Sequence, residues 1–206
     1  MKKAQKIKII LASASPRRKY LLRVLLNNFG LKFVVKPSNI AEYIPRKIAN
    51  FGKFAENLAF LKASETAKKH NGFIIAADTI VVLKNMVLGK PESKTEAAKM
   101  LKQLSGKEHR VYTGLCMINS IAGDVYKTFE VTKVKFRTLN DEEIKFYVAS
   151  GSPMDKAGAY GIQDDFGSTF VEKINGDYFN VVGLPVVKTY LGLNKMLGNK
   201  ISGIGR

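Results

Sequence analysis

The stretch "KIKIILASASPRRKYLL", residues 6–22, places the end of an expected strand directly before the start of an expected helix. Its first half is apolar and rich in isoleucine, which is typical of a buried strand. Ser15 then suits the cap before a helix, and Pro16 suits the first helical turn, where its missing N–H is not needed. A strand that leads straight into a helix indicates an α/β fold.

The turn between this strand and helix also carries cationic and hydroxyl side chains. A helix N-terminus presents unpaired N–H groups and a positive dipole end, and both attract phosphate. Arg17 and Arg18 add rigid forks of donors that match phosphate oxygens in pairs, and Ser13 lies close before them in the chain. The residues therefore predict a phosphate site, although a capped helix with two exposed arginines would show the same spacing.

Apolar periodicity extends this pattern along the chain. The expected strands after the first cover residues 31–38, 72–83, 86–88, 110–118 and 126–136. The expected helices after the first cover residues 54–70, 93–106, 140–151 and 184–197, and a hairpin around Asn175-Gly176 is expected over residues 168–183. We therefore expect one domain over residues 1–206, with a core at about 8–190, a mixed sheet and a frayed tail at 198–206.

The composition is that of a folded protein, with 46% hydrophobic and 25% charged residues. The length suits one domain, although two lobes around a cleft would also fit. The single cysteine, Cys116, has no internal disulfide partner, which fits a core position and a reducing cytoplasm. The apolar part of the N-terminal region is too short for a signal peptide, and no apolar run is long enough for a membrane helix. We therefore expect a cytoplasmic protein with no membrane partner.

The net charge of +17 comes from 34 basic and 17 acidic residues, and such an excess attracts polyanions. Most of the basic residues are lysines scattered along the chain, with no block of five or six. This distribution favours a solvated surface over a dedicated nucleic-acid-binding surface.

A carboxylate interrupts the apolar run "FIIAADTIVVL", residues 73–83, where Asp78 is followed by Thr79. Burial of an unpaired carboxylate is strongly unfavourable. Asp78 must therefore meet a cation, a metal or hydrogen-bond donors, or face a cleft. Such positions are common at functional sites, so Asp78 is a candidate functional residue, with a structural ion pair as the alternative.

Three further polar residues interrupt structural surroundings. Lys62 follows apolar residues in "ENLAFLKA", so it either lies along an apolar face or reaches an anion. Lys90 lies in the constrained turn "GKP", which suits either a phosphate contact or an exposed turn. Gln163 in "DKAGAYGIQDD" offers an acceptor and a pair of donors, the set that can read a base edge. Together these groups suit a nucleotide.

Seven segments occur together and in order: "LASASPRR", "LAFLKA", "AADTIV", "GKP", "SGKEHRVYTG", "YVASGSPMDKAGAYGIQ" and "INGDYFNVVGLP". They resemble the Maf-like family of nucleoside triphosphate pyrophosphatases, and the resemblance runs from about Lys8 to Tyr190. It implies an elongated, twisted mixed sheet flanked by helices, with two lobes around a deep cleft, as in the inosine triphosphate pyrophosphatases. "AADTIV" and "AGAYGIQ" resemble the subgroup that acts on dTTP and UTP, rather than the relatives that act on 7-methyl-GTP.

The resemblance also implies roles for individual residues. It implies that Asp78 is the proton acceptor, and that Mg²⁺ or Mn²⁺ is held by Glu42 and Asp78. The positions that it links to substrate choice are Arg17, Thr79 and Gln163. The positions that it links to phosphate binding are Ser13, Arg17, Arg18, Lys62 and Lys90. The chain departs from the family at Ala41, where a second acidic residue is usual, and at Asn57, where arginine is usual.

The reaction implied is hydrolysis of dTTP or UTP to the monophosphate and pyrophosphate, which removes unwanted nucleotides from the pool. Homodimers are common in the family, and some members are linked to arrest of septum formation. The high positive charge also suits a different class, a non-catalytic regulatory protein that binds nucleotides or nucleic acid. The polar residues singled out above fall on turns between strands and helices rather than on one basic face. The sequence therefore favours an enzyme over a regulatory binding protein.

Overall fold

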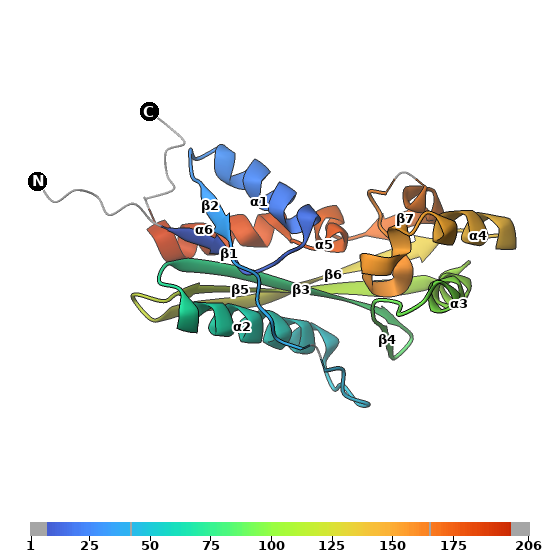
Figure 1. The fold of residues 1–206 in the computed structure, drawn as a ribbon, viewed down its shortest axis with the longest axis horizontal. Coiled ribbons are helices and arrows are strands. Elements are labelled where there is room, and N and C mark those ends of the chain that lie inside the picture. Colours follow the sequence, from blue (N-terminus) through green and yellow to red (C-terminus); the bar gives the residue numbers. More distant parts are fainter. Residues whose placement is uncertain (1–7, 42, 165, 199–206) are drawn as a thin grey trace, which may run out of the picture. The chain divides into compact units, whose positions relative to one another are not determined.

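The computed structural model describes residues 8–41, 43–164 and 166–198. Its strands are β1 (Ile9–Leu11), β2 (Phe33–Val35), β3 (Phe73–Leu83), β4 (Met86–Leu88), β5 (Glu108–Asn119), β6 (Asp124–Phe136) and β7 (Val171–Asn175). Its α-helices are α1 (Pro16–Asn27), α2 (Phe51–Lys69), α3 (Lys94–Leu104), α4 (Asp141–Ala149), α5 (Tyr178–Val182) and α6 (Val186–Leu197) (Figure 1). Between α4 and β7 lie the short 3₁₀ helices η1 (Ser152–Asp155), η2 (Ala157–Ala159) and η3 (Gly167–Phe170). The α/β class is confirmed.

The strands form one mixed sheet in the order β2-β1-β3-β5-β6-β7, and β4 pairs with β3 beside this path. β1 runs parallel to β2 and β3, so that Leu11 lies opposite Val35 on one side and Ile75 on the other. β4 runs antiparallel to β3, because Lys84 and Asn85 turn the chain back as a hairpin. β7 runs antiparallel to β6. These pairings confirm the mixed sheet that the sequence predicts.

The chain divides into two compact units. The first unit comprises Met1–Asp78, Gly114–Phe129 and Gly183–Arg206, and the second comprises Thr79–Thr113 and Glu130–Val182. β3, β5 and β6 each contribute residues to both units. The deep cleft that the family resemblance implies stays a prediction.

In the first unit, α2 covers one face of the sheet, and α1 and α6 cover the other (Figure 1). Ala59 and Ala63 of α2 pack with Ile74 of β3 and Cys116 of β5 in a fully buried cluster. Their small side chains let the helix approach the sheet closely. Burial raises the pKa of the Cys116 thiol to about 12, so the thiol stays protonated. The prediction that Cys116 is a core residue is confirmed.

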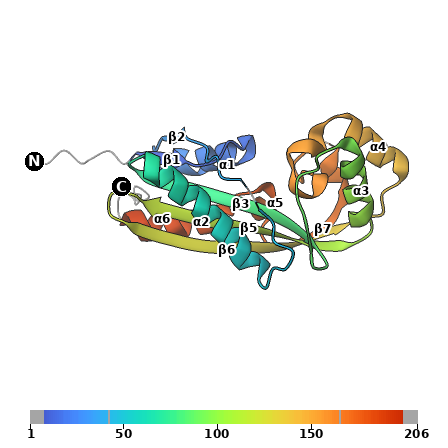
Figure 2. The ribbon, with the colours of Figure 1, turned by 60° about the horizontal axis from the view of Figure 1, so that its bottom comes forward.

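The second unit is built around aromatic side chains. Phe136 of β6 packs edge-to-face against Tyr160 and Phe170. His109 of β5 also packs edge-to-face against Phe136, and its Nε2 lies 2.8 Å from the Tyr160 hydroxyl. Burial lowers the pKa of His109 to about 3, so the ring is neutral and structural. Helices α3 and α4 of this unit lie side by side (Figure 2).

Side chains cap the N-termini of two helices of the second unit. The Ser93 hydroxyl accepts from the N–H of Glu96 at 3.1 Å and opens α3. The Asn140 amide oxygen accepts from the N–H of Glu143 at 2.8 Å, and the Glu143 carboxylate accepts from the N–H of Asn140 at 2.9 Å. This reciprocal pair satisfies two donors at the start of α4.

The hairpin expected over residues 168–183 is wrong. Val171–Asn175 is a strand, but Tyr178–Val182 is the helix α5. The Asp177 carboxylate accepts from the N–H of Phe179 at 2.8 Å. This local bond offers the backbone a turn that leads into a helix, in competition with a second strand after Asn175-Gly176.

Within the residues that the structure describes, no helix has the length and apolar character needed to cross a membrane.

Candidate active site

The turn between β1 and α1 holds Arg18 in a fixed position. The Ser15 hydroxyl caps α1 by accepting from the N–H of Arg18 at 3.4 Å. The Arg18 guanidinium donates to the Ser13 hydroxyl at 3.2 Å and, through Nε, to the carbonyl of Gly183 at 2.8 Å. Ser13 is 8% exposed, and Arg17 and Arg18 are half-buried. The turn is therefore more than a capped helix with two exposed arginines, because it builds a partly buried cationic site at a helix N-terminus.

Asp78 meets a cation, which is one of the partners that its burial demands. Ile74 and Ala76 of β3 face α2, and Asp78 is the next residue in this alternating row. Its side chain is 4% exposed and accepts from the ammonium group of Lys62, which is 12% exposed. The sequence predicts that Lys62 either lies along an apolar face or reaches an anion. The structure shows the second arrangement, in which the anion is Asp78. The ammonium fixes the orientation of the Asp78 carboxylate.

The strand register places Asp78 near the arginine turn within the first unit. Leu11 lies opposite Ile75, and the N–H of Ala12 donates to the carbonyl of Ile75 at 2.8 Å. Asp78 lies three residues further along β3, on the part that extends past the C-terminal end of β1. In parallel sheets this end, where the strands lead into helices, is the usual place for ligand-binding residues. Ser13, Arg18 and Asp78 all lie beyond the C-terminal end of β1.

Thr79 belongs to a chain of hydroxyl and amide groups in the second unit. Its hydroxyl lies 2.9 Å from the hydroxyl of Thr113, and Thr113 donates to the carbonyl of Asn180 at 2.9 Å. Because a hydroxyl has one hydrogen, Thr79 is the donor in the bond to Thr113. The Asn180 amide is fully buried and donates to the carbonyl of Val111 and to the hydroxyl of Thr132, each at 3.0 Å. These bonds fix the Thr79 side chain.

Lys90 is exposed and directly follows Gly89, the first residue after β4. The carbonyl of Gly89 accepts from the N–H of Gly158 at 2.9 Å. Gly158 has a φ of +70°, and a Cβ there would press against Val81 of β3. The structure therefore brings the "GKP" turn and the "AGAYGIQ" segment together within the second unit.

Gln163 is exposed and lies in a turn in which the N–H of Asp164 donates to the carbonyl of Gly161 at 3.2 Å. It is the third residue of that turn, so the turn backbone presents its side chain to solvent. Tyr160, another residue of this segment, is 5% exposed and so cannot offer a face for stacking on a base.

The metal expectation rests on Glu42 and Asp78. Glu42 lies outside the described residues. In the part of the chain that the structure describes, no three His, Cys, Asp or Glu side chains come together as a metal site. Mg²⁺ is commonly bound through one or two carboxylates together with substrate phosphates. The carboxylate of Asp78 fits this manner of binding because it offers two oxygens.

Sequence reasoning missed the groups that support the site residues. Thr113 and Asn180 lie in segments that carry the family resemblance, but the sequence does not predict their roles, because these depend on contacts between distant parts of the chain. Asn180 gave the best signal, since it is a polar residue within the apolar stretch "YFNVVGLP". Like Asp78, Asn180 is a polar residue in an apolar run, and such a residue needs a hydrogen-bonding partner when it is buried.

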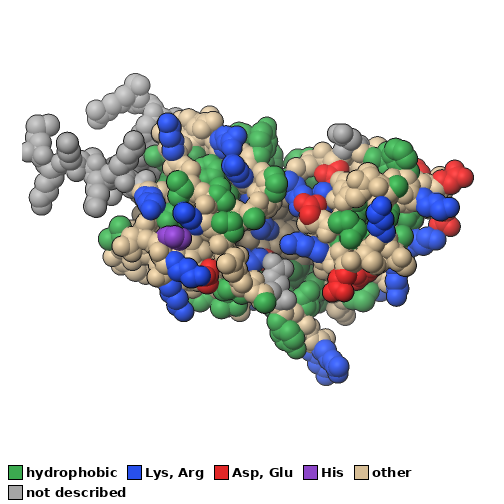
Figure 3. Space-filling view, viewed as in Figure 1, with side chains coloured by type: hydrophobic (Ala, Val, Ile, Leu, Met, Phe, Trp, Pro, Cys, Tyr) green, Lys and Arg blue, Asp and Glu red, His purple; other side chains and the backbone are tan. Residues whose placement is uncertain are grey.

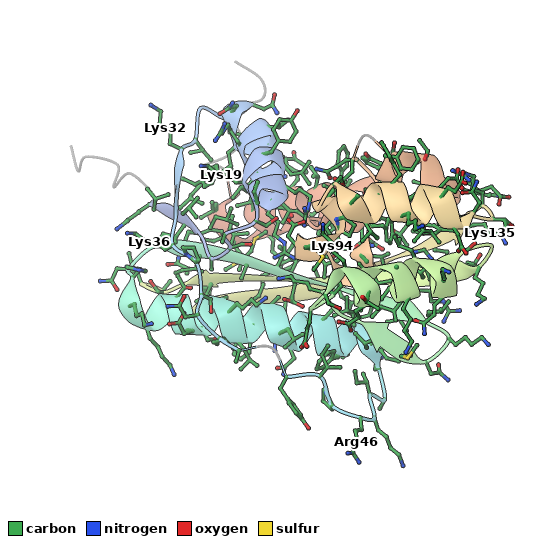
Figure 4. All side chains as sticks on the ribbon, turned by 45° about the vertical axis from the view of Figure 1, so that its right-hand side comes forward. Lys19, Lys32, Lys36, Arg46, Lys94 and Lys135 are labelled. Carbon is green, nitrogen blue, oxygen red and sulfur yellow. The ribbon has the colours of Figure 1, made fainter. Side chains whose placement is uncertain are left out.

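The basic side chains do not gather into one patch on the face drawn in Figure 3. Those labelled in Figure 4 come from separate segments of the chain: Lys19, Lys32, Lys36, Arg46, Lys94 and Lys135. This distribution is typical of a solvated surface.

Residues 8–196 match the model of a family described as Maf-like protein. A dTTP/UTP pyrophosphatase of Alkaliphilus oremlandii is 50% identical over 182 residues, which are 87% of this chain and 91% of that protein. The corresponding enzyme of Desulforamulus reducens is 47% identical over 181 residues, 87% of this chain and 92% of that protein. That of Caldanaerobacter subterraneus subsp. tengcongensis is 46% identical over 201 residues, 97% of this chain and 94% of that protein.

Among solved structures, a nucleoside-triphosphatase / dITP/XTP pyrophosphatase from Mycobacterium abscessus matches with a TM-score of 0.47 and 15% identity, covering 90% of this chain and 93% of that chain. At this distance the likeness adds nothing about function.

Proposed function

This chain belongs to the Maf-like family, and on that premise we propose that it hydrolyses dTTP and UTP to the nucleoside monophosphate and pyrophosphate. The observation that carries the proposal is the buried Asp78–Lys62 pair on the part of β3 past the end of β1, where the turn after β1 presents Arg18. A buried acceptor and fixed cations are the groups that phosphoryl transfer needs.

In the proposed reaction, water attacks the α-phosphorus, the bond from that phosphorus to the bridging oxygen breaks, and pyrophosphate leaves with the bonding electrons. Asp78 accepts the proton of the attacking water or orients that water, and Lys62 keeps its carboxylate in position. Arg17, Arg18 and Lys90 stabilise the negative charge of the phosphates and of the leaving group.

A divalent cation, Mg²⁺ or Mn²⁺, would neutralise charge on the phosphate oxygens, with Asp78 and Glu42 as its protein ligands. Thr79 and Gln163 are proposed to choose the base. The Gln163 amide can donate to O4 of thymine or uracil and accept from N3–H. Thr79 is suited to such a role because its hydroxyl is held by Thr113.

We propose that the enzyme acts in the cytoplasm as a homodimer. Apolar side chains of two packed helices of the first unit support the dimer. Tyr20 and Val24 of α1 and Val187 and Leu191 of α6 are each about half exposed or more, and the two helices contact each other. Within each helix the two residues are four positions apart and so share one face, and large apolar side chains exposed on one face are typical of an interface.

The test is pyrophosphate release from dTTP, UTP, CTP, GTP and 7-methyl-GTP with Mg²⁺ or Mn²⁺. The expected result is release from dTTP and UTP, which a chelator abolishes. Preferred release from 7-methyl-GTP would place the chain in another subgroup. A folded protein that binds dTTP and releases no pyrophosphate would instead support the regulatory binding protein.

A further inference from the structure

One buried hydroxyl holds both ends of the turn that presents Gln163. The Tyr147 hydroxyl of α4 accepts from the N–H of Gly161 at 3.2 Å and donates to Oδ2 of Asp164 at 2.8 Å. Gly161 and Asp164 are the first and last residues of the turn, which the bond between them at 3.2 Å closes. Tyr147 is 2% exposed, so this contact lies in the core of the second unit.

Two further donors contact the Asp164 carboxylate. The Ser152 hydroxyl donates to the same oxygen, Oδ2, at 2.8 Å, and the ammonium of Lys156 lies 3.1 Å from it. The side chains of Lys156 and Asp164 are 9% and 16% exposed. Three donors on one largely buried carboxylate oxygen leave the end of the turn little freedom.

The backbone at Gly161 allows this arrangement. A Cβ at position 161 would overlap the Asp164 carboxylate, so the turn closes this tightly only around a glycine. Burial raises the pKa of Tyr147, and the Asp164 carboxylate raises it further. The phenol therefore keeps its hydrogen and stays a donor to Asp164.

We infer that Tyr147, Asp164, Ser152 and Lys156 form a frame that fixes the reach of Gln163, and that this fixed reach selects pyrimidine over purine nucleotides. We call these four residues the turn frame. The inference rests on the proposed function, because it assumes that Gln163 reads the base. Its members are positioning residues, and Gln163 alone would touch the substrate.

The hydrogen-bonding pattern of the base explains why reach matters. Uracil offers O4 as an acceptor and N3–H as a donor. Hypoxanthine, the base of ITP, offers the same pair as O6 and N1–H, but its fused second ring places that edge farther from the sugar. If the turn were mobile, the Gln163 amide could reach the edge of either base. On a fixed turn, the amide can reach only an edge that lies at one distance from the sugar. The pattern alone cannot separate UTP from ITP, so the separation must come from position.

The experiment measures kcat and KM for UTP and ITP by pyrophosphate release, in the full chain with Mg²⁺. In Tyr147→Phe, we expect kcat for UTP to stay within about threefold, while the UTP/ITP ratio of kcat/KM falls about fivefold, the lower end of the effect expected when the two hydrogen bonds of the hydroxyl are lost. Ser152→Ala removes a less buried donor to Asp164 and should lower the UTP/ITP ratio by about twofold. This variant tests the same inference if Tyr147→Phe does not fold.

Tyr160→Phe is the matched control. It also removes a buried tyrosine hydroxyl of the second unit, but this hydroxyl bonds to His109 and not to the turn. It should lower the unfolding temperature and leave the UTP/ITP ratio unchanged. A ratio that falls in Tyr147→Phe and holds in Tyr160→Phe supports the turn frame.

Other outcomes overturn the inference. A UTP/ITP ratio that is unchanged in folded Tyr147→Phe and Ser152→Ala would show that the frame is only structural. A wild-type enzyme that cleaves UTP and ITP equally well would overturn the selection by reach and leave pyrophosphate hydrolysis standing. A wild-type protein that cleaves no nucleotide at all would instead overturn the proposed function.

Discussion

The turn before α1 and the turn that carries Gln163 are held in place by different means. At the first, a helix N-terminus, two serines and a backbone carbonyl fix Arg18, and an ammonium fixes the nearby strand residue Asp78. At the second, a neutral phenol and a largely buried carboxylate fix a surface turn whose side chain at Gln163 is exposed. The first arrangement fixes charges, which suits catalysis. The second arrangement fixes how far Gln163 reaches toward the base, which suits recognition.

This difference separates the expected effects of substitutions. Changes at Arg18 and Asp78 should lower the rate for every nucleotide, because they act on phosphates that all nucleotides share. Changes at the Gln163 turn should alter the preference among nucleotides. Substitutions in both regions test whether the two effects are separate.

Asp78→Asn should have the largest effect. It removes the proton acceptor and leaves Lys62 beside a neutral amide, so kcat for dTTP should fall about 10³-fold, within the usual range for loss of a general base. Pyrophosphate release measures this, and far-UV circular dichroism checks the fold. Near wild-type turnover in a folded variant would remove Asp78 from the mechanism.

Arg18→Lys should have the next largest effect. Lysine keeps the charge but loses the fork that joins Ser13 and Gly183, so kcat/KM should fall about ten- to hundredfold for dTTP, UTP and ITP alike. Arg23→Lys, an exposed change on the same helix, is the control and should leave the kinetics unchanged. A change confined to one base would assign Arg18 to recognition and contradict the comparison.

Gln163→Ala should act on preference. Loss of the amide removes the contacts with the uracil edge, so the UTP/ITP ratio of kcat/KM should fall about tenfold or more while kcat changes little. Steady-state kinetics on both nucleotides measure this. An unchanged preference would remove the base-reading role and the basis for the turn frame with it.

The smallest expected effect is on stability and comes from His109. Its pKa is about 3 in the folded state because of burial, and lies near 6.5 in the unfolded state. The unfolded state therefore binds more protons as the pH falls below 6.5, and the free energy of unfolding falls with it. Between pH 7.5 and 5.5 this contribution is about 1 kcal/mol.

Urea unfolding at both pH values measures this loss of stability, and His109→Gln should lack it. The same pH dependence in His109→Gln would assign the effect to other groups. The prediction also tests whether His109 is buried in the folded state, where it packs against the aromatic residues in the core of the second unit.

The two regions were not equally visible in the sequence. Asp78 stood out because a carboxylate in an apolar strand needs a partner, and Arg17 and Arg18 because they follow a proline at a helix start. Gln163 was visible through its segment, but the frame behind it was not. Tyr147 begins the segment "YVASGSPMDKAGAYGIQ", but within α4 it has the pattern of an ordinary apolar residue, and no periodicity predicts its contacts with Gly161 and Asp164.

Long-range contacts account for most of what the sequence did not show. The strands and most helices follow from local periodicity and caps, such as the capping box at Asn140. The hairpin expected after Asn175 failed because the Asp177 side chain offers the backbone a competing turn. The bond from Arg18 to Gly183 joins residues 165 positions apart, so no local pattern announces it.

The most direct test of the central claim is hydrolysis of dTTP in ¹⁸O-labelled water with Mg²⁺, followed by mass spectrometry of the products. Attack at the α-phosphorus predicts one ¹⁸O atom in the phosphate of dTMP and none in the pyrophosphate. Label in the pyrophosphate, or release of dTDP and inorganic phosphate, would contradict the proposed reaction.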